Sequence, residues 1–256
     1  MNTQKYIYDP IKEASKHCHL LDLYHILPTL RKDIKIHLDS FRYTHTDIIY
    51  LILAIIDICN FRVGNRKYKK STGIATLKNG HITIHDNCSN IAFYGKRQVI
   101  NHCEILSDKM NTILMNLSEY KDDNDFIFTY KDVNNKEHRI NADHINELLG
   151  KYGNITTKMF RTWKANYYFI KTLKYLDIPQ TKTAINKNIS LAVTTAANKL
   201  HHTPAICRKS YIDSRIVKQY REYSENFIFS IKNIGNENPY LLDGEEDLMN
   251  VLDYLC

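Results

Sequence analysis

The sequence predicts an α+β fold that is mostly α-helical, with a small three-stranded antiparallel sheet near residues 73–97. Three observations support this prediction. Apolar residues recur at helical spacing through residues 11–61 and again through residues 103–256. Between these stretches the pattern changes to the alternation of strands around an Asn-Gly pair. No repeat or low-complexity linker divides the chain, so we expect a single domain over residues 1–256.

The first helical stretch contains two expected interruptions. Pro28 should break it, because proline lacks the amide hydrogen that a helix interior requires. The polar cluster at residues 44–47 should break it again, and Asp47 or Thr46 would cap the apolar helix that follows and ends near Asn60. The apolar run at residues 48–56 is too short to cross a bilayer, so we expect a buried helix and no membrane partner.

The sheet is predicted from the segment "GIATLKNGHITIHDN", residues 73–87. Asn79-Gly80 lies between two short runs and favours a hairpin, because both central residues of a type I′ turn need positive φ. Ile82 and Ile84 would share one face of the second strand. The segment "IAFYGK", residues 91–96, would form the third strand.

Helices follow in the second half of the chain. Residues 155–176 are expected to form one helix with a Thr N-cap, which Pro179 would end, and a second helix would cover about residues 182–200. Thr203-Pro204 then begins another helix, with Thr as the N-cap and Pro at the first position. Tyr211 would lie about two turns into that helix.

The charge pattern favours a polyanionic partner. The formal net charge is +7, yet the residues from Glu237 onward include six acidic and no basic ones. The first 236 residues therefore carry a net charge of +13. A basic body of this size is typical of proteins that bind nucleic acid.

The cysteines indicate neither a metal site nor disulfides. No two of them form a CxxC pair, which makes zinc binding unlikely on spacing alone. The sequence also begins without a secretory signal, which argues against a disulfide framework. The six are Cys18, Cys59, Cys88, Cys103, Cys207 and Cys256.

Several basic residues and one tyrosine have the chemistry needed to act on a phosphodiester. Cations hold the negative charge that gathers on the non-bridging oxygens, and a tyrosine can attack the phosphorus. Lys158 and Arg161 are one turn apart on a predicted helix. The full candidate set is Arg62, Lys96, Lys158, Arg161, His202 and Tyr211.

These residues occur in contexts that resemble the poxvirus-type type IB DNA topoisomerases, within the wider superfamily that includes the tyrosine recombinases. The matching segments are "RVGNRKY", "GIATLKNGHI", "FYGK", "TTKMFRTWKA" and "HHTPAICRKSYI". The last two are the most specific, and the resemblance covers roughly residues 25–215. It implies a helical catalytic domain that relaxes supercoiled double-stranded DNA as a monomer.

The resemblance also implies roles for the residues. Tyr211 would be the nucleophile and form a 3′-phosphotyrosine, while Arg62, Arg161 and His202 would hold the phosphate oxygens. Lys96 would protonate the 5′ leaving oxygen, assisted by Lys158. The basic loop would contact DNA phosphates through Arg66, Lys67, Tyr68, Lys69 and Lys70. No carboxylate cluster in these motifs looks suited to Mg²⁺, so we expect no cofactor, metal or ATP requirement.

Two alternatives remain at this point. A tyrosine recombinase would make the same covalent link, but recombinases usually have His-x-x-Arg where this chain has Lys158 and Arg161, and they lack the Arg-x-Gly-Asn motif. A non-catalytic DNA-binding module would bind DNA without forming an adduct. The loop between Tyr68 and Gly73 is shorter than in the family, and we expect the family's N-terminal β-rich clamp domain to be absent. We expect an intracellular protein, in the virion or the host cytoplasm or nucleus if it is viral.

Overall fold

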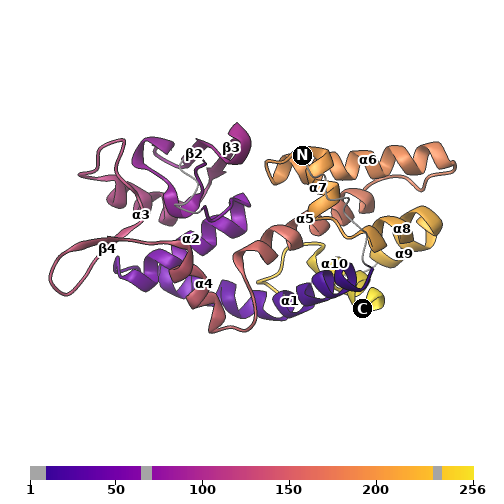
Figure 1. Ribbon diagram of the computed structural model, residues 1–256, viewed down its shortest axis with the longest axis horizontal. Helices are drawn as coiled ribbons and strands as arrows, with labels where there is room; N and C mark the ends of the chain where they lie inside the picture. The colour runs from indigo at the N-terminus through magenta and orange to yellow at the C-terminus, as the bar shows by residue number, and fades with distance from the viewer. Residues whose placement is uncertain (1–9, 65–70, 233–237) are drawn as a thin grey trace, which may run out of the picture.

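The structure is a computed structural model that describes residues 10–64, 71–232 and 238–256. Figure 1 shows the sheet β1–β3 with α2, α3 and α4 on one side of the molecule and α5 to α10 on the other, while the long helix α1 runs beneath both. The helices are α1 (Pro10–Asp39), α2 (His45–Cys59), α3 (Asp108–Ser118), α4 (Ala142–Gly150), α5 (Thr157–Lys174), α6 (Lys182–Lys199), α7 (Pro204–Ser210), α8 (Ser214–Glu222), α9 (Ser224–Lys232) and α10 (Glu245–Leu255).

The predicted three-stranded antiparallel sheet is present, in the order β1-β2-β3. Its strands are β1 (Ile82–Ile84), β2 (Ser89–Tyr94) and β3 (Ile100–Ile105). It therefore begins and ends later than residues 73–97. A two-stranded sheet, β4 (Thr129–Lys131) with β5 (Glu137–Arg139), lies inside the stretch that the sequence predicted to be helical.

The Asn-Gly hairpin prediction is wrong. Residues Asn79–His81 form a short 3₁₀ turn instead. The amide of Asn79 donates to the Asp125 carbonyl oxygen at 2.8 Å, and the amide of Gly80 donates to that of Asp123 at 2.9 Å. A loop more than 40 residues further along the chain thus takes the hydrogen bonds that a hairpin turn would have used.

Pro28 does not break the first helix. It lies inside the 30-residue helix α1, which the sequence analysis expected to be two shorter segments. Leu23, Leu27 and Leu30 are completely buried, so the core contacts the helix on both sides of the proline. Burial of each of these side chains contributes about 1.5–3 kcal/mol to the stability of the fold. Together they outweigh the free-energy cost of the helix hydrogen bond that the proline removes.

Helix α2 is the buried apolar helix that the sequence predicts. Its N-cap is Thr44 rather than Thr46 or Asp47, and Asp47 completes a capping box three residues later. At the other end Asn60 has φ 58° and ψ 26°, the left-handed conformation that ends many helices. Within the described residues, no helix is long and apolar enough to cross a membrane.

The structure contradicts the expectation that the cysteines are unpaired. Cys18 is bonded to Cys256, with Cα atoms 5.7 Å apart, and Cys59 is bonded to Cys103, with Cα atoms 5.5 Å apart. The first pair joins α1 to the end of α10, which packs against it, and the second joins the end of α2 to β3. Pairing depends on these long-range contacts, which cysteine spacing alone does not reveal.

Candidate active site

Five of the six residues predicted for phosphodiester chemistry line one cavity of about 520 Å³. The cavity lies where the segment after α2 and the sheet loop meet α5 and the end of α7. Four of its lining side chains are cationic, and none of its lining residues is acidic. The lining residues are Arg62, Val63, Gly64, Ser71, Thr72, Lys96, Thr157, Lys158, Arg161 and Tyr211.

Two glycines fix the backbone that carries Arg62. The Arg62 carbonyl oxygen accepts a hydrogen bond of 2.9 Å from the amide of Ile74. Gly64 has φ +84°, and a Cβ placed on Gly73 would lie 2.5 Å from the Gly64 Cα. The two chain segments therefore approach so closely that only glycine fits. The motif "RVGN" supplies Gly64 to this contact, and the motif "GIATLK" supplies Gly73.

Arg161 is a buried cation without a carboxylate partner among the described residues. Its side chain is 4% exposed. Its guanidinium donates to two main-chain oxygens, those of Asn60 and, at 2.8 Å, Leu200. Burial lowers the pKa of Arg161 to about 10, so the group stays charged at neutral pH. A buried positive charge held only by neutral acceptors favours an anion in the adjoining cavity.

His202 connects the two arginines. Its Nε2 lies 3.0 Å from the Arg62 Nη2 and also contacts the Arg161 Nη2. Because guanidinium groups only donate, Nε2 must accept in this arrangement, and the ring proton is on Nδ1. The adjacent His201 instead contacts the Cys59 carbonyl oxygen at 3.3 Å.

Burial, together with the neighbouring arginines, lowers the pKa of His202 to about 3. The pKa in the unfolded chain is about 6.5, so between these values the unfolded chain binds more protons. The stabilising contribution of neutral His202 is therefore complete above pH 6.5 and is lost as the pH falls toward 3.

We expect the unfolding free energy of the DNA-free protein to fall more steeply from pH 6.5 to pH 4.5 than that of the His202→Gln variant. The extra slope should stay below about 1.4 kcal/mol per pH unit, the limit for one proton, because solvent reaches part of the ring. Urea unfolding at several pH values measures this difference. Parallel slopes for the two proteins would contradict the assignment.

Tyr211 lies at the C-terminal end of α7, directly after its last residue, Ser210. Thr203 caps this helix and Pro204 begins it, as predicted. The ring centroids of Tyr211 and His202 are 4.5 Å apart, and the Arg161 guanidinium carbon lies 5.8 Å from the Tyr211 ring. Tyr211, the nucleophile that the resemblance implies, therefore lies beside His202 and Arg161.

Asn166, which the sequence analysis did not select, fixes the backbone at Tyr211. It is completely buried on α5. Its Nδ2 donates to the Tyr211 carbonyl oxygen at 2.9 Å, and its Oδ1 accepts from the Asp213 amide at 2.8 Å. The signal in the sequence was an asparagine inside the predicted helix of residues 155–176, directly after the segment "RTWKA".

We expect Asn166→Ala to slow DNA cleavage by about 10²-fold, because the variant no longer fixes the position of Tyr211. It should also lower the unfolding free energy by about 1–3 kcal/mol, since two buried backbone groups lose their partners. Single-turnover cleavage and urea unfolding measure the two effects. A matched control is Asn188→Ala, because Asn188 also bonds a buried tyrosine, the hydroxyl of Tyr220 at 2.9 Å, but that tyrosine does not line the cationic cavity. Equal rates for the two variants would contradict the expected role of Asn166.

The two lysines of the cavity are less constrained than the arginines. Lys96 lies in the loop between β2 and β3, and Lys158 lies in the first turn of α5, and both are exposed. Within the described residues, neither ammonium group has a carboxylate partner. Both are thus available to a ligand in the cavity. The predicted DNA contacts Arg66, Lys67, Tyr68, Lys69 and Lys70 fall outside the described residues.

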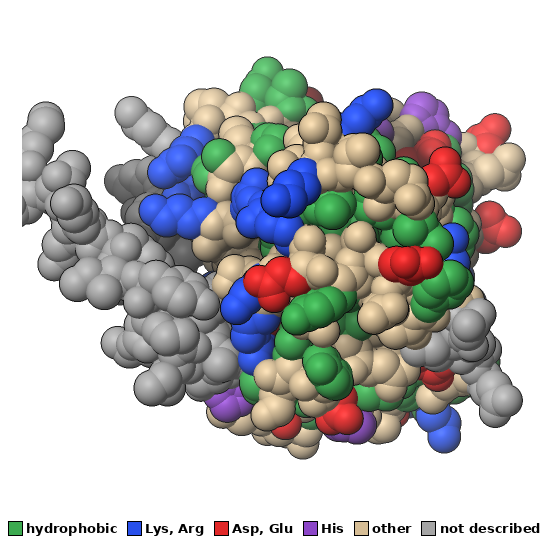
Figure 2. All heavy atoms as spheres, turned by 90° about the vertical axis from the view of Figure 1, so that its right-hand side faces the viewer, with side chains coloured by type: hydrophobic (Ala, Val, Ile, Leu, Met, Phe, Trp, Pro, Cys, Tyr) green, Lys and Arg blue, Asp and Glu red, His purple; other side chains and the backbone are tan. Residues whose placement is uncertain are grey.

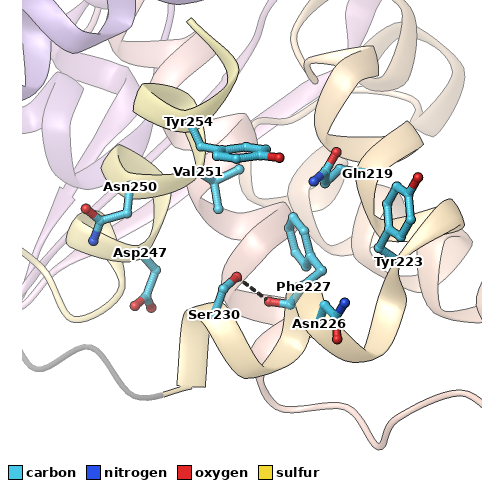
Figure 3. Close-up of a pocket in the computed structure, with 9 residues that line it drawn as sticks. All are labelled: Gln219, Tyr223, Asn226, Phe227, Ser230, Asp247, Asn250, Val251 and Tyr254. Carbon is cyan, nitrogen blue, oxygen red and sulfur yellow. Dashed lines mark hydrogen bonds between the residues drawn. The ribbon is translucent and has the colours of Figure 1, made fainter.

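A second cavity, of about 480 Å³, lies between α8, α9 and α10 (Figure 3). Aromatic rings and side-chain amides line it, and the Ser230 hydroxyl donates to the Phe227 carbonyl oxygen at 2.8 Å. It contains none of the candidate catalytic residues. The candidate catalytic residues are therefore concentrated at the cationic cavity.

Charge is unevenly distributed on the surface as well. Figure 2 shows the end of the molecule at the right of Figure 1, where α6, α8 and α9 lie. Most of the Lys and Arg side chains visible there gather on the left half of the view, and acidic side chains are more frequent on the right. This end of the molecule therefore has a more basic half and a more acidic half.

Comparison with known proteins identifies the family of this chain. The family described as "Eukaryotic DNA topoisomerase I, catalytic core" matches residues 9–237. The chain is 30% identical over 226 residues to DNA topoisomerase 1B of Acanthamoeba polyphaga mimivirus, which covers 84% of this chain and 67% of that protein. It is 28% identical over 183 residues to DNA topoisomerase 1 of rabbit fibroma virus, covering 68% of this chain and 54% of the relative.

A further relative is DNA topoisomerase 1B of vaccinia virus, strain Copenhagen, with 28% identity over 180 residues, 65% of this chain and 51% of that protein. The chain thus matches about two thirds of the mimivirus protein and about half of each of these two poxvirus proteins. The match to the family extends over most of the chain and includes every candidate catalytic residue. This chain belongs to the type IB DNA topoisomerases and carries their catalytic core.

Proposed function

We propose that this chain relaxes supercoiled double-stranded DNA by cutting one strand, holding the cut end on Tyr211 as a 3′-phosphotyrosine, and resealing it. The observation that carries the proposal is the contact of His202 with Arg62 and Arg161 beside Tyr211, at a cavity whose lining includes both arginines and Tyr211 and has no acidic side chain. Since all these residues come from one chain, the proposed working form is a monomer.

A DNA phosphodiester in the cavity would replace His202 as the acceptor for the arginine N–H groups. Its two non-bridging oxygens would take the donors of Arg62 and Arg161, which are now directed at Nε2. Once released from that acceptor role, the imidazole could carry its proton on Nε2 instead of Nδ1 and donate a hydrogen bond from Nε2 to one of the same oxygens. Each such donor, by analogy with an oxyanion hole, would contribute about 3 kcal/mol to transition-state stabilisation.

Attack by the Tyr211 oxygen would form one P–O bond and break the bond from phosphorus to the 5′ oxygen. The phenol proton would pass to solvent, and nearby cations favour that loss. The 5′ alkoxide is a stronger base than phenolate and needs a proton to leave. Lys96, as an ammonium group at the cavity, is the proposed general acid, and Lys158 its proposed assistant.

Resealing would reverse these steps. One phosphodiester replaces another at each stage, so the reaction would need no ATP. Between the two steps the duplex could turn about the intact strand. Relaxation of DNA by this exchange would therefore need no external source of energy.

A plasmid assay tests this function. Purified protein incubated with supercoiled plasmid in EDTA, without ATP, should yield relaxed plasmid. Plasmid that remains supercoiled across a series of protein and salt concentrations would contradict the proposal. Four-way junction products on paired sites would favour a recombinase, and salt-sensitive binding without an adduct would favour a DNA-binding module.

Arg161→Lys is expected to slow single-turnover cleavage by about 10²–10³-fold, because a lysine supplies the charge without the forked pair of donors. A rapid-quench measurement on a short duplex gives the rate. The matched control is Arg221→Lys, on the exposed surface of α8, which should cleave at the wild-type rate. Similar rates for the two variants would show that bidentate contact by Arg161 is not needed.

A further inference from the structure

The loop that carries Lys96 has a costly backbone conformation. It comprises Lys96–Gln98, between β2 and β3. Arg97 has φ 64° and ψ 29°, and Gln98 has φ 58°. Two successive non-glycine residues in the left-handed region cost free energy, and such a conformation persists only where the surroundings enforce it.

Asn101, the second residue of β3, contacts the base of this loop. Its side chain is 6% exposed, and its Nδ2 donates to the Val99 carbonyl oxygen at 2.9 Å. The same oxygen accepts from the Gly95 amide at 2.8 Å. Both bonds converge on one carbonyl group at the base of the loop, so the Asn101 amide reinforces the closing pair of the hairpin.

Gly95 makes room for this amide. A Cβ placed on Gly95 would collide with the Asn101 Nδ2, although the φ of Gly95, −88°, suits any residue. The glycine is therefore required by the packed asparagine rather than by its own backbone. Gly95 directly precedes Lys96, so the contact acts immediately beside the cationic side chain.

We propose that Asn101 is a positioning residue for Lys96, which it holds toward the cavity through Gly95 and Val99. This inference rests on the proposed role of Lys96 as the general acid. Asn101 does not itself reach the cavity lining. It acts by restricting where the loop places the ammonium group, and general-acid catalysis depends on such placement.

The test compares two leaving groups. In a DNA substrate with sulfur in place of the bridging 5′ oxygen, the leaving group is a thiolate, the conjugate base of a thiol with a pKa of about 8.5. It departs without a proton. We expect Asn101→Ala to slow single-turnover cleavage of the ordinary substrate by about 10- to 100-fold, and to cleave the sulfur substrate within about 3-fold of wild type.

The variant Lys96→Ala, tested on the same two substrates, separates the role of Asn101 from the role of Lys96 itself. If Lys96→Ala is slow on both substrates, Lys96 is not the general acid and the proposed role fails. If Lys96→Ala recovers on the sulfur substrate but Asn101→Ala remains slow, Asn101 acts elsewhere and the inference is overturned. Wild-type cleavage of the ordinary substrate by Asn101→Ala would also overturn it. His102→Ala, at the next and exposed position of β3, controls for disturbance of the strand and should be near wild type.

A second variant keeps the test decisive if Asn101→Ala folds poorly. Gly95→Ala should reproduce the slow cleavage of the ordinary substrate and its recovery with sulfur. In the Asn101→Ala background the added methyl group has space, so Gly95→Ala should lower the cleavage rate there by less than about 3-fold. The effects of the two substitutions on the rate would then be non-additive. An equal cost of Gly95→Ala in both backgrounds would show that the two residues do not act through their contact.

Discussion

Tyr211→Phe is expected to abolish covalent attachment to DNA, with a loss of at least about 10⁴-fold in cleavage. The change removes one oxygen atom and keeps the ring that lies 4.5 Å from His202. DNA binding should therefore remain close to wild type, because the cations around the cavity are untouched. Adduct formation after SDS treatment and binding by gel shift measure the two properties separately.

The control for this variant is another tyrosine that lies outside the cavity. Tyr223 follows α8 and is 55% exposed. Tyr223→Phe should form adduct at the wild-type rate. Adduct formation by Tyr211→Phe, or loss of adduct in the control, would contradict the assignment of Tyr211 as the nucleophile.

Glu245→Ala is expected to lower the unfolding free energy by about 3–5 kcal/mol, because it leaves buried cations without part of their counter-charge. Glu245 is completely buried at the start of α10. Its carboxylate accepts from Arg31 at 2.6 and 2.9 Å and from the Trp163 indole nitrogen at 3.0 Å. The acidic C-terminal helix thus has a structural role in the core.

Asp57 completes the same network from α2. Arg31 binds it at 2.7 and 3.0 Å, and the Lys164 Nζ lies 3.0 Å from its Oδ1. Burial tends to raise the pKa of Asp57, but Lys164 and Arg31 outweigh it and hold this pKa well below its usual range. The network joins α1, α2, α5 and α10, and its Lys164 lies about one turn after Arg161 on α5.

Urea unfolding of Glu245→Ala measures the predicted loss. The matched control is Glu246→Ala, at the next and only partly buried position, which should cost less than about 1 kcal/mol. Similar losses for the two variants would show that the buried network contributes little to stability.

The sequence predicted those features that depend on local chemistry. The capped start of α7 at Thr203-Pro204 and the ends of α5 and α6 follow from cap residues and Pro179, and the structure confirms them within a few residues. The sequence motifs also predicted the candidate catalytic residues, and in the structure His202 contacts both Arg62 and Arg161.

Features that depend on distant segments were not predictable. Asn79-Gly80 carries the strongest local hairpin signal, yet the loop at residues 121–125 binds it. Pro28 stays within a helix because the core contacts both sides of it. The roles of Asn166 and Asn101 depend on hydrogen bonds to main-chain atoms elsewhere, and no residue pattern specifies such partners.

The most direct test of the central claim is the polarity of the covalent adduct. Duplex DNA labelled at either the 5′ or the 3′ end of the cut strand is incubated with wild-type protein, and the reaction is stopped with SDS. If Tyr211 forms a 3′-phosphotyrosine, the 5′ label should migrate with the protein, while the 3′ label should appear in a free fragment with a 5′ hydroxyl. A protein that carries the 3′ label, or no adduct with either label, would contradict the account.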